Sequence, residues 1–278
     1  MDYLQRAKAF RAKKRLGQNF LVDADVIEDI IEFADISPDD TVVEIGPGLG
    51  FLTEILVQRA KKVFAVELDE DAIVQLEKIK TDNLEIIHND ILKTDISAFG
   101  SNLKIVANIP YYITGPIIAH LIGEVYDTDN KNRKAISEIT LMTQYEAALR
   151  IVANEKSPNK EYGLLSILVQ FNADAEIKRF VKARSFFPAP KVNSAVLKLK
   201  IKDKPMLELD DYNFFSKVAK ACFATRRKNI KNSLSNAGFA ANAVKQALQN
   251  LGIPENIRGE VLSVPEIGKL ATELMSLL

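Results

Sequence analysis

Between residues 24 and 144, short apolar segments with a strand pattern alternate with longer segments of helical pattern. In residues 25–34 the apolar side chains share one helical face, which carries Val26, Ile27, Ile30, Ile31 and Ala34. Such alternation is typical of parallel strands with helices on both faces of the sheet. The strand segments are apolar along almost their whole length, as expected for strands covered on both sides. The sequence therefore predicts an α/β fold.

The same spacing gives the bounds of the expected elements. Strands are expected at residues 41–45, 62–68, 84–90, 103–108 and 135–143, and helices at 25–34, 51–60, 69–80 and 115–125. Two further strands, at 175–181 and 194–201, should form an antiparallel edge of the same sheet. Beyond a polar stretch near residue 205 the pattern is helical throughout. We therefore expect two domains, an α/β domain with a basic N-terminal arm (residues 1–205) and a small all-helical domain (residues 206–278).

The composition excludes several kinds of site. Cys222 is the single cysteine, which rules out an internal disulfide and a thiolate zinc cluster, and two histidines give little basis for a histidine-rich metal site. Ala221 and Phe223 predict that Cys222 lies in a core. No apolar run approaches the roughly 18 to 20 residues that a membrane span needs. The basic N-terminus also lacks the apolar segment of a signal peptide. We therefore expect a cytoplasmic monomer with no metal and no membrane partner.

The charges of the chain are unevenly distributed although the net charge is zero. Segments 1–15, 178–191 and 217–231 together carry 17 of the 37 basic residues and one acidic residue, Asp2. Segregation of this kind allows a neutral protein to present a phosphate-binding face. The alternative is that each segment is a solvated helix face, and the sequence does not show whether the three segments converge.

A glycine-rich loop, "EIGPGLG" at residues 44–50, follows one expected strand and precedes an expected helix. Its glycines, Gly46, Gly48 and Gly50, allow a tight turn and let a ligand approach the backbone N–H groups. Phe51 stands where a dinucleotide-binding loop would need its third glycine. The loop therefore predicts a nucleoside-containing ligand, with a plain turn as the alternative.

Two carboxylates end the next two expected strands. Glu67 lies twenty-one residues after Gly46, where it can accept hydrogen bonds from ribose hydroxyls. Asp90 is placed to accept a hydrogen bond from an adenine amino group. The loop has no Walker lysine, and this pattern favours S-adenosylmethionine over NAD or ATP.

The segment "NIPYY", residues 108–112, ends the fourth expected strand with groups that hydrogen-bond and stack. Methylation of an exocyclic adenine nitrogen requires acceptors that hold the amino group and align it with the methyl donor. The Asn108 side chain and a carbonyl of Ile109 or Pro110 can accept from that group, and Tyr111 can stack on a base outside its helix. The alternative is an ordinary X-Pro turn with two interfacial tyrosines.

Six motifs together carry a family resemblance. In chain order they are "KKRLGQNFL", "EIGPGLG", "ELD", "NIPYY", "FFPAPKVNSAV" and "ATRRKNIKNSL". The chain thereby resembles the KsgA family, the small-subunit ribosomal RNA adenine N6,N6-dimethyltransferases, over nearly its whole length. The resemblance implies a Rossmann-like methyltransferase sheet and S-adenosylmethionine as cofactor. It also implies transfer of two methyl groups to each of two adjacent adenosines. These lie in a hairpin loop near the 3′ end of small-subunit rRNA and are modified during ribosome assembly.

The resemblance also assigns roles to individual residues. It implies a cofactor-binding set of Gln18, Asn19, Leu21, Gly46, Gly48, Glu67, Leu68, Asp90, Ile91 and Asn108. It implies catalytic roles for Asn108, Pro110, Tyr111 and Phe186, the last stacking on the target base unless it is an edge-strand core residue. It implies RNA contact through Arg226, Arg227 and Lys228. Tyr145 stands where the family commonly has lysine, so position 145 receives no role.

Three other functions remain open alternatives. One is the erythromycin-resistance type of methyltransferase, which modifies an adenine of large-subunit rRNA and carries similar motifs. Another is an assembly factor that acts mainly by binding the small subunit. The third is a DNA adenine methyltransferase, for which the sequence offers no evident sequence-reading domain.

Overall fold

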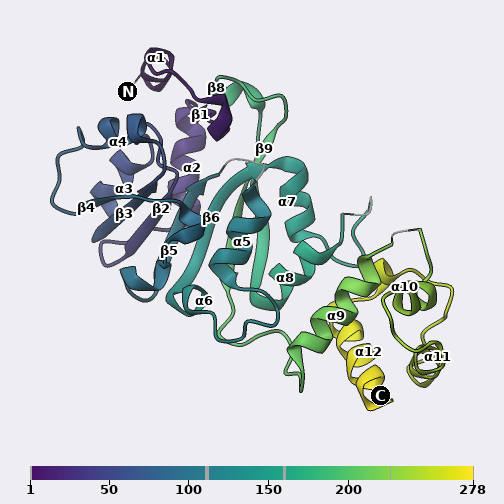
Figure 1. The fold of residues 1–278 in the computed structure, drawn as a ribbon. Coiled ribbons are helices and arrows are strands. Elements are labelled where there is room, and N and C mark those ends of the chain that lie inside the picture. Colours follow the sequence, from purple (N-terminus) through teal and green to yellow (C-terminus); the bar gives the residue numbers. More distant parts are fainter. Residues whose placement is uncertain (1, 110–112, 159–160, 226, 278) are drawn as a thin grey trace. The chain divides into compact units, whose positions relative to one another are not determined.

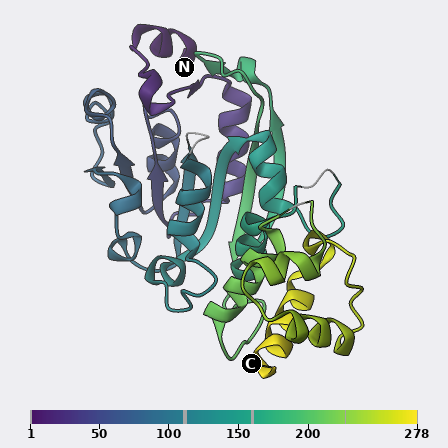
Figure 2. The same cartoon turned by 45° about the vertical axis from the view of Figure 1, so that its right-hand side comes forward.

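The computed structural model describes residues 2–109, 113–158, 161–225 and 227–277, and its chain forms two compact units (Figures 1 and 2). The first unit comprises residues 1–123, 129–149 and 174–201, and the second comprises 124–128, 150–173 and 202–278. The second unit thus adds two earlier segments to the helical region expected from the sequence. The single boundary expected at residue 205 stays a prediction.

A seven-stranded sheet forms the centre of the first unit, with strand order β4-β3-β2-β5-β6-β9-β7. The strands are β2 (Thr41–Ile45), β3 (Lys62–Glu67), β4 (Leu84–His88), β5 (Leu103–Asn108), β6 (Ile136–Gln144), β7 (Ala173–Val181) and β9 (Ser194–Ile201). The first five of these strands, β2 to β6, run parallel to one another, and β9 runs antiparallel to β6. The Rossmann-like α/β fold is confirmed.

The order of the strands reverses between β2 and β5, because the chain first builds outward through β3 and β4 and then returns. Ile45 at the end of β2 is level with Val66 of β3 and with Ala107 of β5. The residues that follow these strands therefore meet at one edge of the sheet. In open α/β sheets, ligands bind at such a reversal, beyond the carboxyl ends of the strands.

Helices cover both faces of this sheet (Figure 1). The helices of the first unit are α1 (Tyr3–Ala9), α2 (Ala24–Ala34), α3 (Thr53–Arg59), α4 (Glu70–Leu76), α5 (Thr114–Ile122), α6 (Lys131–Ala135) and part of α7 (Tyr145–Val152). Met142 of β6 packs in the hydrophobic cluster formed with α2. The next residue, Thr143, shares a hydrogen bond of 2.6 Å with Thr114 of α5. Because successive strand residues point to opposite faces, α2 and α5 lie on opposite sides of the sheet.

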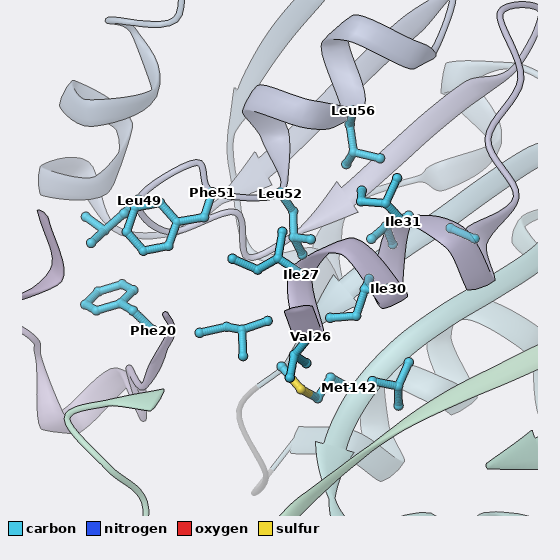
Figure 3. Packing of buried hydrophobic residues seen from close by; sticks show 14 of the residues in the cluster. Phe20, Val26, Ile27, Ile30, Ile31, Leu49, Phe51, Leu52, Leu56 and Met142 are labelled. Atoms are coloured by element: carbon cyan, nitrogen blue, oxygen red, sulfur yellow. The ribbon is translucent and has the colours of Figure 1, made fainter. Parts of the chain in front are cut away.

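The core between α2 and the sheet is built from the apolar face that the sequence predicts. Ala34 is buried, and so are Val26, Ile27, Ile30 and Ile31, which are labelled in Figure 3. They pack with Leu52 and Leu56 near the start of α3 and with residues of the central strands. Burying each of the valine, leucine and isoleucine side chains contributes about 1.5–3 kcal/mol. This packing fixes the helix that precedes β2 and the glycine loop that follows it.

A second, two-stranded sheet joins distant parts of the first unit. Here β1 (Phe20–Leu21) pairs antiparallel with β8 (Phe186–Phe187), Phe20 opposite Phe187 and Leu21 opposite Phe186. The N–H of Val22 donates to the carbonyl of Ser185 at 2.9 Å. Short 3-10 turns precede both strands, at Lys14–Leu16 and at Ala183–Ser185. This pairing ties the N-terminal arm to residues near 186, and no pattern in the sequence indicates it.

The second unit is helical, as expected. It contains α8 (Leu164–Asn172), α9 (Tyr212–Phe223), α10 (Ile230–Asn236), α11 (Ala241–Asn250) and α12 (Val264–Ser276). Cys222 is buried, which confirms its predicted core position, and burial raises the pKa of its thiol to about 12. Among the helices of the described residues, none is long and apolar enough to span a membrane.

Candidate active site

A pocket of about 160 Å³ opens in the first unit beyond the carboxyl ends of β2, β3, β4 and β5. Its lining includes every residue of the expected cofactor set and Phe186, that is Gln18, Asn19, Leu21, Gly46, Gly48, Glu67, Leu68, Asp90, Ile91, Asn108 and Phe186. Pro110, Tyr111 and Arg226 lie outside the described residues, and Arg227 and Lys228 belong to the second unit. Residues spread over 169 positions of the chain thus meet in one pocket.

The glycine loop adopts the backbone conformation that its residues favour. Gly46 and Gly48 have φ angles of 67° and 57°, in the left-handed region that other residues rarely enter. A Cβ atom on Gly46 would lie 3.8 Å from the carbonyl oxygen of Asn108, and one on Gly48 would lie 3.1 Å from the Phe20 ring. The loop therefore passes close to both the end of β5 and the arm, and glycine keeps it open to a ligand.

Glu67 ends β3 and is almost fully buried. Its carboxylate accepts hydrogen bonds from the N–H groups of Gly48 at 2.9 Å, Leu68 at 2.8 Å and Asp69 at 2.9 Å. Burial raises the pKa of Glu67, and the three N–H groups oppose that effect. A carboxylate has about four acceptor positions. The bonds from described residues leave room on the oxygen that faces Gly48 for one more donor, such as a ribose hydroxyl.

Asp90 follows β4 and caps a short 3-10 helix, Ile91–Lys93. Its Oδ1 accepts the N–H of Leu92 at 3.0 Å, and its own N–H donates to the Asn89 side chain at 2.9 Å. These bonds fix the half-buried carboxylate in the pocket wall while leaving it acceptor capacity. Leu68, which is 51% exposed, and the buried Ile91 add apolar surface to the same pocket. This combination suits a flat base that carries an amino group.

Asn108 is the last residue of β5 and is half-buried. The next residue, Ile109, is buried and donates its N–H to the carbonyl of Met142 at 3.2 Å, which ties the strand end to β6. Asn108 therefore enters the pocket from a strand held on both sides by the sheet.

Glu44 is a pocket residue that our sequence interpretation missed. It lies within β2, is 1% exposed, and accepts a hydrogen bond of 2.6 Å from the Thr53 hydroxyl. Burial raises its pKa to about 8, and the nearby charge of Glu67 adds to the effect. The available signal was an acidic residue within an otherwise apolar strand, directly before the glycine loop.

Asp69 is the second missed residue, and it holds the N-terminal arm against the pocket. Its buried carboxylate accepts hydrogen bonds from the Gln18 amide and from the ammonium group of Lys13. The Gln18 side-chain oxygen in turn accepts the N–H of Lys13 at 2.7 Å. Burial alone would raise the pKa of Asp69, but the bonds from Lys13 and Gln18 outweigh burial and lower it. We call this network the arm latch.

The chemistry of the pocket is that of hydrogen-bond acceptors around apolar walls. Within the part of the chain that the structure describes, no group of three or more histidine, cysteine, aspartate or glutamate side chains could hold a metal ion. The carboxylates of Glu67 and Asp90 can receive hydroxyl and amino donors and attract positive charge. The pocket thus fits a nucleoside with a cationic substituent.

Comparisons with known proteins agree with this chemistry. A family model described as ribosomal RNA adenine dimethylase matches residues 9–274. A protein named ribosomal RNA small subunit methyltransferase A from Clostridium acetobutylicum is 42% identical over 270 residues, covering 95% of this chain and 94% of its own length. The protein of the same name from Moorella thermoacetica is 38% identical, with 98% and 95% covered.

Two solved structures are similar over most of the chain. A dimethyladenosine transferase from Plasmodium falciparum superposes with a TM-score of 0.77 at 27% identity, covering 92% of this chain and 98% of that one. The 23S rRNA methyltransferase ErmE gives 0.68 at 27% identity, with 92% and 100% covered. Together with a family model that spans almost every residue, these likenesses place the chain in the ribosomal RNA adenine dimethylase family.

Proposed function

We propose that the protein transfers methyl groups from S-adenosylmethionine to the N6 amino groups of two adjacent adenosines. The acceptors lie in a hairpin loop near the 3′ end of small-subunit rRNA and receive two methyl groups each during ribosome assembly. The observation that carries this proposal is the meeting of the predicted cofactor residues and Phe186 in one pocket. Family membership and the small-subunit names of relatives about 42% identical support it.

The pocket residues fit S-adenosylmethionine, which when bound supplies a methyl group on a sulfonium centre. Glu67 would accept from the ribose hydroxyls, and Asp90 from the adenine amino group, with Leu68 and Ile91 against the base. Gln18, Asn19 and Leu21 would close over the methionine end. A cationic ligand is favoured here because the Glu67 carboxylate is buried, where electrostatic interactions are stronger than in water.

Asn108 would hold the methyl acceptor. Its side-chain oxygen can accept a hydrogen bond from the adenine N6 and so align the nitrogen lone pair with the methyl group. Phe186 would stack on the target base after it has left its helix. Pro110 and Tyr111 are proposed as further contacts to the amino group and base. The nitrogen would bond to the methyl carbon as its bond to sulfur breaks, which leaves S-adenosylhomocysteine as product. The methylated nitrogen would then lose its proton to solvent, so no ionised base is needed in the pocket.

The proposed partner is the small ribosomal subunit. Arg226, Arg227 and Lys228, which precede α10 in the sequence, would contact rRNA phosphates. We further propose that the protein acts as a monomer in the cytoplasm.

The erythromycin-resistance type of activity is the second candidate, because the ErmE structure superposes over 92% of this chain. Sequence identity favours the small-subunit activity, because the chain is 42% identical to a small-subunit methyltransferase and 27% identical to ErmE. A protein that acts mainly by binding would retain the subunit contacts without needing the cofactor pocket.

Methyl transfer to isolated subunits tests the proposal. Labelled S-adenosylmethionine is supplied with small subunits lacking the modification, and separately with unmodified large subunits. We expect N6,N6-dimethyladenosine at two adjacent small-subunit positions. Asn108→Ala should lower the rate at least about a hundredfold, as loss of one well-placed polar group commonly does. Asn242→Ala, on the exposed start of α11, is the matched control.

Each other outcome identifies an alternative. Label confined to the large subunit would assign the protein to the resistance type. Tight subunit binding without label, by wild-type protein and Asn108→Ala alike, would leave a binding factor.

A further inference from the structure

The strand pair β1–β8 brings together two basic segments that are far apart in the sequence. Lys14 and Arg15 lie in the turn before β1, and Lys182 and Arg184 lie around the turn before β8. Both figures show α1, β1 and β8 side by side (Figures 1 and 2). All four side chains are exposed. We call these four residues the basic collar.

The charges of the basic collar are not balanced by neighbouring carboxylates. Among the described residues, none of the four collar side chains forms an ion pair. Adjacent basic residues differ, because Lys13 pairs with Asp69 and Asp71, and Arg179 pairs with Asp29. Next to the turn before β8, the carboxylate of Asp23 accepts the Ser185 hydroxyl at 2.7 Å. The Asp23 carboxylate keeps its charge, because the hydroxyl donor is neutral. The four cations of the basic collar outnumber this acid, so the collar has a net positive charge available to a partner.

The basic collar also has a defined place around the pocket. In an antiparallel pair, the segments that precede the two strands lie at opposite ends of the pair. Lys14 and Arg15 therefore lie beyond one end, and Lys182 and Arg184 beyond the other. Between them, Phe20, Leu21 and Phe186 of the strand pair line the pocket.

We propose that the basic collar binds the phosphates of a single-stranded RNA segment on both sides of the adenosine that enters the pocket. The inference rests on the proposed function. A base that reaches Phe186 must leave its stack, which bends the strand and brings its flanking phosphates near the pocket rim. Arginine offers a phosphate two parallel N–H donors, and lysine offers a mobile charge. The two collar ends therefore suit the phosphates before and after the target nucleotide.

The salt dependence of binding tests this inference. Two double variants, Lys14→Ala/Arg15→Ala and Lys182→Ala/Arg184→Ala, remove one end each. The control, Lys61→Ala/Lys80→Ala, removes two exposed lysines near the amino ends of β3 and β4. Binding to unmodified small subunits is measured at several salt concentrations. Each phosphate contact to single-stranded nucleic acid contributes about −0.7 to the logarithmic slope, so each collar variant should flatten it by about 1.4.

The variants should also raise the KM for subunits while leaving kcat and S-adenosylmethionine affinity at wild-type values. Intact cofactor binding shows that each variant is folded. If both collar variants keep the wild-type slope, as the control should, the inference is overturned while the proposed function stands. A wild-type protein that labels no small subunits would overturn the proposed function and this inference with it.

Discussion

The two walls of the pocket are held in different ways. One wall consists of strand ends, with Gly46, Glu67, Asp90 and Asn108 placed directly after or at the end of β2, β3, β4 and β5. The other is the N-terminal arm, held by a strand pair of two residues and by the arm latch. The first wall inherits the rigidity of the sheet, whereas the second depends on a few side-chain bonds. The strand-end wall should therefore set chemistry and stability, and the arm should set access.

Removal of Glu67 would break the strand-end wall, with the largest expected effect. Glu67→Ala leaves the N–H groups of Gly48, Leu68 and Asp69 without their acceptor. At about 1 kcal/mol for each lost bond, the free energy of unfolding should fall by about 3 kcal/mol. S-adenosylmethionine affinity should fall at least about a hundredfold as well. Denaturant unfolding and calorimetric titration measure the two effects.

Glu85→Ala is the matched control, because this exposed glutamate of β4 pairs with Lys62 at the surface. Exposed ion pairs contribute about 0.2–1 kcal/mol, so the control should change stability little. Equal losses in both variants would mean that Glu67 does not organise the loop.

Glu44 sharpens the comparison, since it gives the strand-end wall a pH dependence. Its pKa is about 8 in the folded protein against the usual 4.5, so between these values the folded state keeps a proton that the unfolded state releases. The contribution of Glu44 to the free energy of unfolding is therefore largest below pH 4.5 and falls as the pH rises toward 8. Each pH unit over which the folded state keeps the extra proton corresponds to about 1.4 kcal/mol, and about two such units lie between pH 6 and 9. Wild type should therefore lose about 3 kcal/mol of unfolding free energy over this range through Glu44.

Glu44→Gln keeps the size of the side chain and removes its titration. At pH 9 the variant should have a higher free energy of unfolding than wild type, and at pH 6 the two values should lie closer together. Thermal unfolding across that pH range measures the difference. Glu85→Gln should follow the wild-type curve. An unchanged pH profile in Glu44→Gln would show that the buried carboxyl does not titrate in this window.

The strand-end wall was predictable from the sequence because its signals are local. Each functional residue there follows an apolar run, so predicting the strand also places the residue, and the bounds of β2, β5 and β9 match the expected ones. Helices α9, α10, α11 and α12 were predictable from apolar spacing for the same reason.

The arm wall could not be derived in this way. Strands β1 and β8 have two residues each, too few for any periodicity, and their pairing spans 165 positions. Motif resemblance indicated that Gln18, Asn19 and Leu21 reach the cofactor, but it did not indicate what holds them there. Asp69 gave no local sign of its role, because the bonds it accepts come from Lys13 and Gln18, about 50 residues earlier.

Of the three changes, at Glu67, at Glu44 and at the arm latch, loss of the arm latch should have the smallest effect. That effect should be confined to entry of the cofactor into the pocket. In Asp69→Asn the amide can accept from Lys13, but its NH₂ group opposes that of Gln18. A cost of about 1 kcal/mol corresponds to a roughly fivefold higher KM for S-adenosylmethionine, with kcat unchanged. Trypsin should also cleave faster after Lys13, Lys14 or Arg15. Asp71→Asn, which alters an exposed partner of Lys13 alone, should change neither quantity, because Gln18 stays bound to Asp69. A fall in kcat with arm cleavage unchanged would instead make Asp69 part of the strand-end wall.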